Sequence, residues 1–223
     1  MAVEGAVPAL PDREGYLDRW AALHGGYDPR GNALVRGWLL VAYAVARPLA
    51  SARVPPDLLT LLAVLTSAAV VGLSALGGGW TTAAAALVVV AGLLDNLDGA
   101  VAVLSDRVSG YGMVLDSACD RVSDLLFITS LWAAGAPGLV CVVGGALMFV
   151  QEYVRAHAAV AGMREIGVVT FWERPTRVIV TATFLASAAV LGDPWPELGA
   201  WVWVVLGLVG LTQLVVVVRR RLR

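Results

Sequence analysis

Lysine is absent from this chain of 223 residues, and all 16 of its basic residues are arginine. Only 15% of the residues are charged, whereas soluble domains carry about a quarter. The 17 acidic residues bring the formal net charge to -1, so no overall basic field favours a nucleic-acid partner. The composition therefore argues against both an ordinary soluble enzyme and a nucleic-acid-binding protein.

Cysteine is also scarce, since the chain contains only Cys119 and Cys141, each inside an apolar run. Their spacing fits neither a zinc site nor a disulfide framework, so both are expected to be packing residues. Residues 1–15 also lack a basic stretch followed by an apolar one, which is the pattern of a cleavable signal peptide. Membrane insertion is therefore expected to depend on later segments.

Apolar residues are abundant, making up 59% of the chain with a mean hydropathy of +0.78. A bilayer core about 30 Å thick needs a helix of roughly 20 mostly apolar residues. Six runs approach that length between Gly, Pro or charged breaks: Leu58–Leu76, Thr81–Leu104, Met113–Ala134, Leu139–Ala161, Val178–Leu191 with a start near Pro175, and Leu198–Val218. The sequence thus predicts an all-α integral membrane protein with six transmembrane helices.

The segment before these runs differs in character. Leu34–Ala50 is apolar but interrupted by Arg36, Arg47 and Pro48, which suits a juxtamembrane amphipathic helix lying on the membrane. Charge and glycine before it predict a loosely ordered cytoplasmic extension over residues 1–32. Residues 33–223 are then expected to form a single membrane domain.

Charges in the breaks predict the orientation of the bundle. The breaks at 77–79 and 134–138 carry no charge, and the break at 193–197 carries only acids. The opposite side holds the N-terminal arginines together with Arg107, Arg164, Arg174, Arg177, Arg219, Arg220, Arg221 and Arg223. By the positive-inside rule, both termini are expected in the cytoplasm. The prediction is a multi-pass protein of the plasma membrane.

Four carboxylates stand in the second and third predicted spans: Asp95, Asp98, Asp116 and Asp120. An ionised carboxylate in the middle of a membrane helix costs roughly 2.5–3.5 kcal/mol, so such residues normally mark a site. The three-residue spacing of Asp95 and Asp98, and the four-residue spacing of Asp116 and Asp120, place each pair on one face of its helix. Both pairs are expected in the cytoplasmic half of the bundle. Oxygen ligands without His or Cys suit Mg²⁺, Mn²⁺ or Ca²⁺, so a two-metal phosphate site is predicted.

Other interpretations of this acidic cluster remain open. The acids are alternatively buried ion pairs with Arg107, Arg121 or Arg155. A divalent-metal or ion transporter is the alternative from a different class, because intramembrane acids also build ion pathways. The last three spans contain no second acidic pair, however, and the cluster lies towards one membrane face, which favours an enzyme. Asp106 and Asp124 are expected to be structural or solvated.

From Asp95 to Asp120 the chain reads D-x-x-D-G-x-x-A-V-x(8)-G-x(3)-D-x(3)-D. This pattern resembles the signature of the CDP-alcohol phosphatidyltransferase family, in which arginine stands at the position of Val103. Seven of the eight fixed positions match over 26 residues, and the wider resemblance runs from about Leu34 to the C-terminus. It implies an enzyme that transfers a phosphatidyl group from CDP-diacylglycerol to a polar alcohol and releases CMP. The active site would face the cytoplasm.

The resemblance also implies roles for the four acids. Asp95, Asp98 and Asp116 would hold two divalent metals, Mg²⁺ or Mn²⁺, that bind the CDP pyrophosphate. Asp120 would face the same metals and act as the general base that takes the proton of the attacking alcohol. Such a carboxylate beside a hydroxyl is chemically suited to general base catalysis.

Further motif positions concern the donor. Gly99, Ala102 and Gly112 match the positions at which the nucleotide packs against the helices. The arginine that normally contacts the donor phosphate is replaced by Val103. Arg107 lies one helical turn further on and is expected to replace that arginine if the helix extends so far. An unusual donor or a catalytically degenerate homologue is the alternative.

Two other stretches resemble the bacterial phosphatidylinositol-phosphate synthases. They are the V-P-P-D-L-L-T of residues 54–60, and the E-Y-V-R-A-H-A of residues 152–158 followed by E-R-P-T-R at 173–177. In that subgroup basic residues bind the acceptor phosphate, so Arg155, Arg174 and Arg177 are predicted to bind a phosphorylated polyol. Alternatively, these arginines are anchors at the level of the lipid headgroups.

The acceptor stays open between two activities of this family. His157 and Ala159 stand where the subgroup tends to have Arg and Glu. A phosphatidylglycerophosphate synthase-like activity is therefore the alternative to a phosphatidylinositol-phosphate synthase-like one. The resemblance further implies contact with membrane lipid and a homodimer.

Overall fold

The computed structural model describes residues 10–163 and 170–222, and all of their regular structure is helical. The elements are α1 (Arg13–Leu23), the 3₁₀ turn η1 (Pro29–Gly31), α2 (Ala33–Ser51), α3 (Pro56–Leu76), α4 (Gly79–Ser105), α5 (Gly110–Ala133), α6 (Gly138–Val160), α7 (Arg174–Leu191) and α8 (Trp195–Arg221). The predicted all-α class is confirmed. Residues 1–9 of the predicted extension, Arg164 and Arg223 lie outside the described residues.

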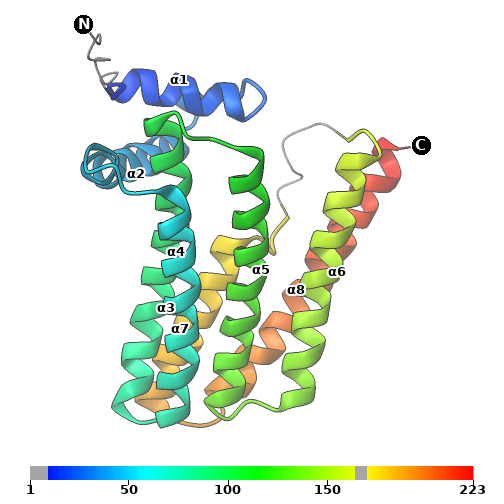
Figure 1. The fold of residues 1–223 in the computed structure, drawn as a ribbon. Helices are drawn as coiled ribbons and strands as arrows, with labels where there is room; N and C mark the ends of the chain where they lie inside the picture. Colours follow the sequence, from blue (N-terminus) through cyan, green and yellow to red (C-terminus); the bar gives the residue numbers. More distant parts are fainter. Residues whose placement is uncertain (1–9, 164–169, 223) are drawn as a thin grey trace, which may run out of the picture.

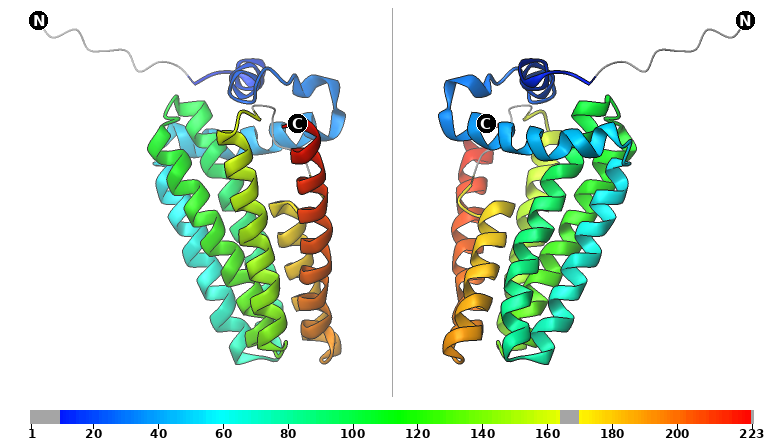
Figure 2. Two further views of the ribbon diagram at one scale, coloured as in Figure 1. Left: turned by 90° about the vertical axis from the view of Figure 1, so that its right-hand side faces the viewer. Right: turned by 90° about the vertical axis from the view of Figure 1, so that its left-hand side faces the viewer.

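The six long helices α3 to α8 run along one another as a bundle (Figure 1). Both α1 and α2 lie across one end of this bundle, roughly perpendicular to its axis (Figure 2). The connection between α4 and α5 and the end of α8 lie at the same end. This end of the bundle therefore gathers the elements that carry most of the arginines.

Local signals determine where the long helices begin and end. Pro56 occupies the first turn of α3, where its missing N–H costs nothing, and Gly77 ends this helix with a φ of 68°. Ser109 caps α5 because its Oγ accepts a hydrogen bond of 3.0 Å from the Gly112 N–H. The six predicted runs match α3 to α8 to within a few residues, and Leu34–Ala50 matches α2.

Apolar side chains on the outside of the bundle identify a membrane protein. Four helices, α3, α4, α6 and α8, are long and apolar enough to cross a bilayer. Only 28–50% of their most apolar 18-residue windows is buried within the protein, so much of the apolar surface faces outwards. Among the six bundle helices, α5 carries acids along its length and α7 begins with two arginines, which lowers their hydropathy.

Two clusters of buried side chains hold the helices together. The larger lies along the bundle and includes Phe127, Leu131, Met148, Trp172 and Trp203. The smaller joins α1 and α2 to α3 and α4 and includes Tyr16, Leu17, Tyr43, Val101 and Leu104. Its position matters for function because it attaches the transverse helices to the end of α4.

The prediction of a loosely ordered extension is wrong for the described residues between Arg13 and Gly31. Asp12 caps α1 by accepting a 2.9 Å hydrogen bond from the Gly15 N–H. Arg30 then pairs with Glu14 at 2.9 Å and Asp18 at 2.7 Å, and these partners raise the pKa of Arg30. The segment is polar on average, but Tyr16 and Leu17 of α1 pack on the bundle. This tertiary contact orders the segment.

Candidate active site

Three of the four predicted acids converge where α4 and α5 face each other. One carboxylate oxygen from each of Asp95, Asp98 and Asp116 lies within 4.8 Å of the others. Asp98 is only 5% exposed, and the Thr60 hydroxyl of α3 donates a 2.5 Å hydrogen bond to its Oδ2. Three helices thus position one group of oxygen atoms, which we call the acidic triad.

Asp120 stands one turn further along α5 and is held by arginines. Arg174 Nη1 lies 2.9 Å from Asp120 Oδ1 and donates to the Asp120 backbone oxygen at 2.8 Å. Arg121 Nη2 lies 3.3 Å from Asp120 Oδ2. Arg174 also lies 2.8 Å from Asp95 Oδ1, so it bridges the acids of the two helices.

The donor atoms of the acidic triad suit a hard divalent cation. Its donors are all carboxylate oxygens, and Mg²⁺ and Mn²⁺ prefer such ligands over sites of nitrogen and sulfur. Among the described residues, neither Asp98 nor Asp116 forms an ion pair with an arginine. Because buried carboxylates without a counter-charge are costly, a bound cation would stabilise the group.

The alternative of simple ion pairs applies to only part of the cluster. Arg121 pairs with Asp120, as described, but Arg155 pairs with Glu152 and Glu173 instead. Asp124 is fully buried and takes the structural role expected of it, as the partner of Arg177 at 2.6 Å. Among the described residues, the arginines therefore pair with Asp95, Asp120 and Asp124 but not with Asp98 or Asp116.

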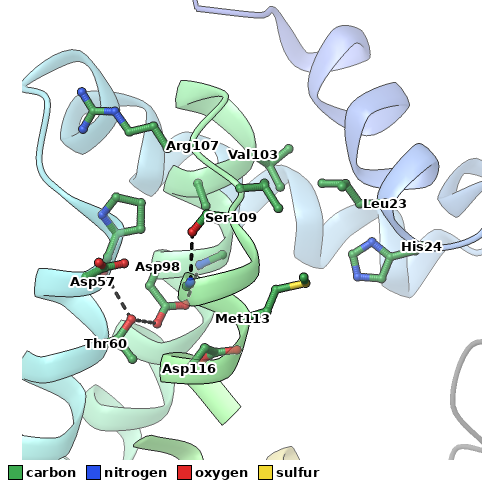
Figure 3. A pocket seen from close by; sticks show the side chains of 15 residues that line it. Leu23, His24, Asp57, Thr60, Asp98, Val103, Arg107, Ser109, Met113 and Asp116 are labelled. Atoms are coloured by element: carbon green, nitrogen blue, oxygen red, sulfur yellow. Dashed lines mark hydrogen bonds between the residues drawn. The ribbon is translucent and has the colours of Figure 1, made fainter. Parts of the chain in front are cut away.

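A cavity of about 260 Å³ opens beside the triad (Figure 3). Asp98 and Asp116 line it, together with all four residues predicted to bind the donor: Gly99, Ala102, Arg107 and Gly112. A Cβ at Gly99 would meet no atom within 4 Å, whereas one at Gly112 would lie 3.1 Å from Ser109 Oγ. Both glycines line this cavity, which we call the motif pocket, and the lack of a side chain at Gly99 leaves open space there for a ligand.

Arg107 reaches the motif pocket by a different route from the one expected. The helix does not extend to it, because α4 ends at Ser105 and Asp106 turns the chain with a left-handed φ of 56°. The Arg107 N–H donates to the Ala102 oxygen at 2.9 Å, which brings the residue back over the pocket. Val103 lines the same pocket from the last turn of α4.

A second cavity of about 770 Å³ lies between α2, α4 and α7. Most of its lining is apolar, with Trp38, Leu93 and Ile179 among the side chains. Asp95 and Arg174 also line it. We call this space the apolar groove; it meets the acids from a different side than the motif pocket does.

The three predicted acceptor arginines are not gathered into one open pocket. Arg174 lies among the acids, as described above. Arg177 is fully buried and pairs with Asp124 at 2.6 Å and Glu152 at 2.9 Å. Arg155 is partly exposed and pairs with Glu173 at 2.7 Å. Sequence reasoning missed Glu152 and Glu173 as partners, although each stands in the stretches singled out for their arginines.

Known proteins resemble this chain over most of its length. The model of the family described as CDP-alcohol phosphatidyltransferase matches residues 53–218. The phosphatidylinositol phosphate synthase of Mycobacterium tuberculosis is 32% identical over 185 residues, which cover 76% of this chain and 81% of that protein.

Solved structures agree with the sequence. The crystal structure of the Mycobacterium tuberculosis phosphatidylinositol phosphate synthase with CDP-DAG bound has a TM-score of 0.67 and 29% identity, covering 80% of this chain and 93% of its own. The same enzyme in complex with manganese and citrate has a TM-score of 0.66 and 30% identity, covering 79% and 88%. Both the sequence and the fold are thus similar to those of a lipid-synthesising enzyme.

Proposed function

The chain belongs to the CDP-alcohol phosphatidyltransferase family, and on this premise we propose that it transfers a phosphatidyl group from CDP-diacylglycerol to inositol phosphate. CMP is the leaving group. The observation that carries the proposal is the position of the acidic triad, between a pocket lined by the family motif and the apolar groove. A transporter would need neither a nucleotide pocket nor this motif.

Mg²⁺ or Mn²⁺ is the proposed cofactor, in a two-metal site. Asp95, Asp98 and Asp116 would hold the ions, with Asp120 as a further ligand of the second. When bound, such ions neutralise phosphoryl oxygens and stabilise the charge on the departing CMP. The oxygen-only donor set supports this assignment, as does the manganese complex of the similar enzyme.

The two cavities support a donor that is part nucleotide and part lipid. We assign the nucleotide to the motif pocket, against Gly99, Ala102, Gly112 and Arg107. The acyl chains would lie in the apolar groove, because burying them there removes apolar surface from water. The pyrophosphate between these parts would then lie at the triad.

Asp120 is the proposed general base. Its carboxylate would take the proton of the acceptor hydroxyl as that oxygen attacks the phosphorus. Arg174 holds this carboxylate in place at 2.9 Å and also pairs with Asp95 of the triad. We assign Arg174 and Arg155 to the acceptor phosphate, and the full burial of Arg177 supports a positioning role through Asp124.

The fold supports a membrane topology with six spans. α5 and α7 pack in the same bundle as the four apolar helices, so we propose that all six cross the bilayer. α2 would lie in the interface, with both termini and the active site facing the cytoplasm of a plasma membrane. Arg219, Arg220 and Arg221 at the end of α8 support this orientation. The homodimer stays a prediction.

An acceptor panel tests the proposal. Purified protein in lipid nanodiscs is given Mg²⁺ and CDP-diacylglycerol, with inositol phosphate, glycerol phosphate, inositol or serine as the acceptor. CMP release with inositol phosphate is the expected result. Release with glycerol phosphate alone would indicate phosphatidylglycerophosphate synthase-like activity. Metal-dependent donor binding without release would indicate a degenerate homologue, and no nucleotide binding would return the transporter to consideration.

The hydroxyl of Thr60 gives a test of the metal site. Thr60→Val is nearly the same size but loses the 2.5 Å hydrogen bond that orients Asp98. Losing such an outer partner typically weakens metal affinity by about 10–100-fold. Mn²⁺ titration of the purified protein measures the change.

A matched control stands on the same helix. Thr66 donates only to the Leu62 backbone oxygen at 2.7 Å on an exposed face of α3. Thr66→Val is therefore expected to bind Mn²⁺ like the parent. Equal affinities in the two variants would contradict the role of the Thr60 hydroxyl in orienting Asp98 for the metal.

A further inference from the structure

Helix α1 reaches the motif pocket although it lies outside the residues matched by the family. The match begins at residue 53, whereas Leu23 and His24 come from the end of α1 and the residue after it. Both side chains line the motif pocket together with Asp98 and Asp116. Figure 3 places them across the pocket from Asp57 and Thr60. The pocket therefore has a wall that the family motif does not supply.

This wall is firmly attached to the bundle. Tyr16 and Leu17 of α1 are 1% and 0% exposed and pack in the cluster that includes Val101 and Leu104 of α4. Arg19 Nη1 donates to the Val103 backbone oxygen at 3.4 Å, at the last turn of α4. Packing and this contact together set the distance between α1 and the motif.

The ring of His24 is held in a defined orientation. Its Nδ1 lies 2.8 Å from the Trp20 backbone oxygen, and the ring stacks on the Trp20 ring with centroids 3.8 Å apart and an interplanar angle of 14°. Because a carbonyl oxygen only accepts, Nδ1 carries the hydrogen. In the neutral ring this leaves Nε2 as an acceptor for an amino or hydroxyl group of a ligand.

The remaining lining indicates what kind of ligand meets this wall. Asp57, Asp98 and Asp116 place the acids on one part of the pocket, while Leu23, Val103, Val108 and Met113 supply apolar surface. A metal-bound pyrophosphate suits the acidic part. A flat heterocycle with an exocyclic amino group suits the apolar part, because the ring packs on apolar side chains and the amino group can donate a hydrogen bond to His24 Nε2. The lipid chains are already accommodated by the separate apolar groove.

We propose that α1 binds the nucleoside part of the donor and of the leaving CMP, through contacts of His24 and Leu23. Arg19 acts as a positioning residue that keeps α1 against Val103. This inference rests on the proposed function, because it names the part of the chain that recognises the nucleotide in that reaction. It adds a specificity element from outside the family's matched region.

The test compares variants of α1 for binding of CMP in the presence of Mn²⁺, by isothermal titration of the full chain in nanodiscs. His24→Ala is expected to weaken CMP binding about tenfold, the loss of one hydrogen bond of about 1.4 kcal/mol. The KM for CDP-diacylglycerol should rise in parallel, with kcat within about twofold of the parent. His24→Gln, which keeps a side-chain acceptor, should recover part of the affinity.

Arg19 and Arg13 provide a matched pair on the same helix. Arg19→Ala is expected to weaken CMP binding severalfold, and Arg19→Lys to restore part of it. Arg13 stands six residues earlier, so it points to another side of α1 and Arg13→Ala should bind CMP like the parent. A thermal melt of each variant shows whether the fold is retained.

Unchanged CMP affinity in both His24→Ala and Arg19→Ala would overturn the inference, even with an active parent enzyme. So would a parent protein that does not bind CMP. A parent that binds CMP but releases none from CDP-diacylglycerol would contradict the proposed function alone. In that case weaker CMP binding by His24→Ala would still support the role of α1.

Discussion

Asp120→Asn is expected to slow CMP release by about 10²–10⁴-fold, the usual contribution of a general base. Asparagine has nearly the same shape but cannot take the proton of the acceptor hydroxyl. Asp120 is proposed as a ligand of the second ion only, so the variant should still bind Mn²⁺ at the site formed by Asp95, Asp98 and Asp116. Arg174 keeps Asp95 as a partner at 2.8 Å, which should preserve the fold.

Two further variants make this result interpretable. Asp116→Asn should lose both CMP release and Mn²⁺ affinity, because it removes an oxygen of the triad itself. Asp106→Asn is the control, since Asp106 lies beyond the end of α4 and asparagine also tolerates its left-handed φ of 56°. Asp120→Asn with the activity of the parent would disprove the general-base assignment. A large loss of thermal stability would instead indicate a structural role.

Arg177→Met is expected to have the largest effect on stability, lowering the free energy of unfolding by about 3–5 kcal/mol. The guanidinium of Arg177 is fully buried between Asp124 of α5 and Glu152 of α6, at 2.6 and 2.9 Å. Methionine fills much of the space but leaves the Asp124 carboxylate in a dry environment with a weaker set of partners. Denaturant unfolding in detergent micelles measures the loss.

A double variant separates charge from packing. Arg177→Met combined with Asp124→Leu removes both members of the buried pair, and should recover much of the stability because no unpaired charge remains between them. Arg30→Met serves as a surface control, since its ion pairs are solvent-exposed and should contribute little. Equal losses in the single and double variants would show that packing, not charge, dominates at Arg177.

Local signals in the sequence were enough to predict the long helices. Each of the six apolar runs is bounded by prolines, glycines or charges, and α3 to α8 begin and end close to these signals. Hydropathy depends only on the composition of a short stretch of sequence, so it can be used without knowing which helices pack together. The same reasoning failed for α1, whose order comes from Tyr16 and Leu17 packing on helices far along the chain.

The candidate site also has some features that were predictable from the sequence and others that were not. The spacing of Asp95 with Asp98, and of Asp116 with Asp120, was sufficient to predict an acidic face on each of two helices, because three- and four-residue intervals repeat on one face of a helix. The short connection between these helices predicted that the two faces meet. The partners of the arginines were not predictable, since Arg174 meets acids from α4 and α5 and Arg177 meets Glu152 of α6. Those pairings depend on how separate helices are placed.

By itself, the sequence determined that this protein is an all-helical membrane protein with an acidic motif of a phosphotransferase family. Helix periodicity and hydropathy are properties of neighbouring residues, so they can be read along the chain. The tertiary structure alone decided that Arg177 is buried, that two cavities reach the acids from different sides, and that the end of α1 lines the motif pocket. These features arise between residues distant in sequence, and only packing brings them together.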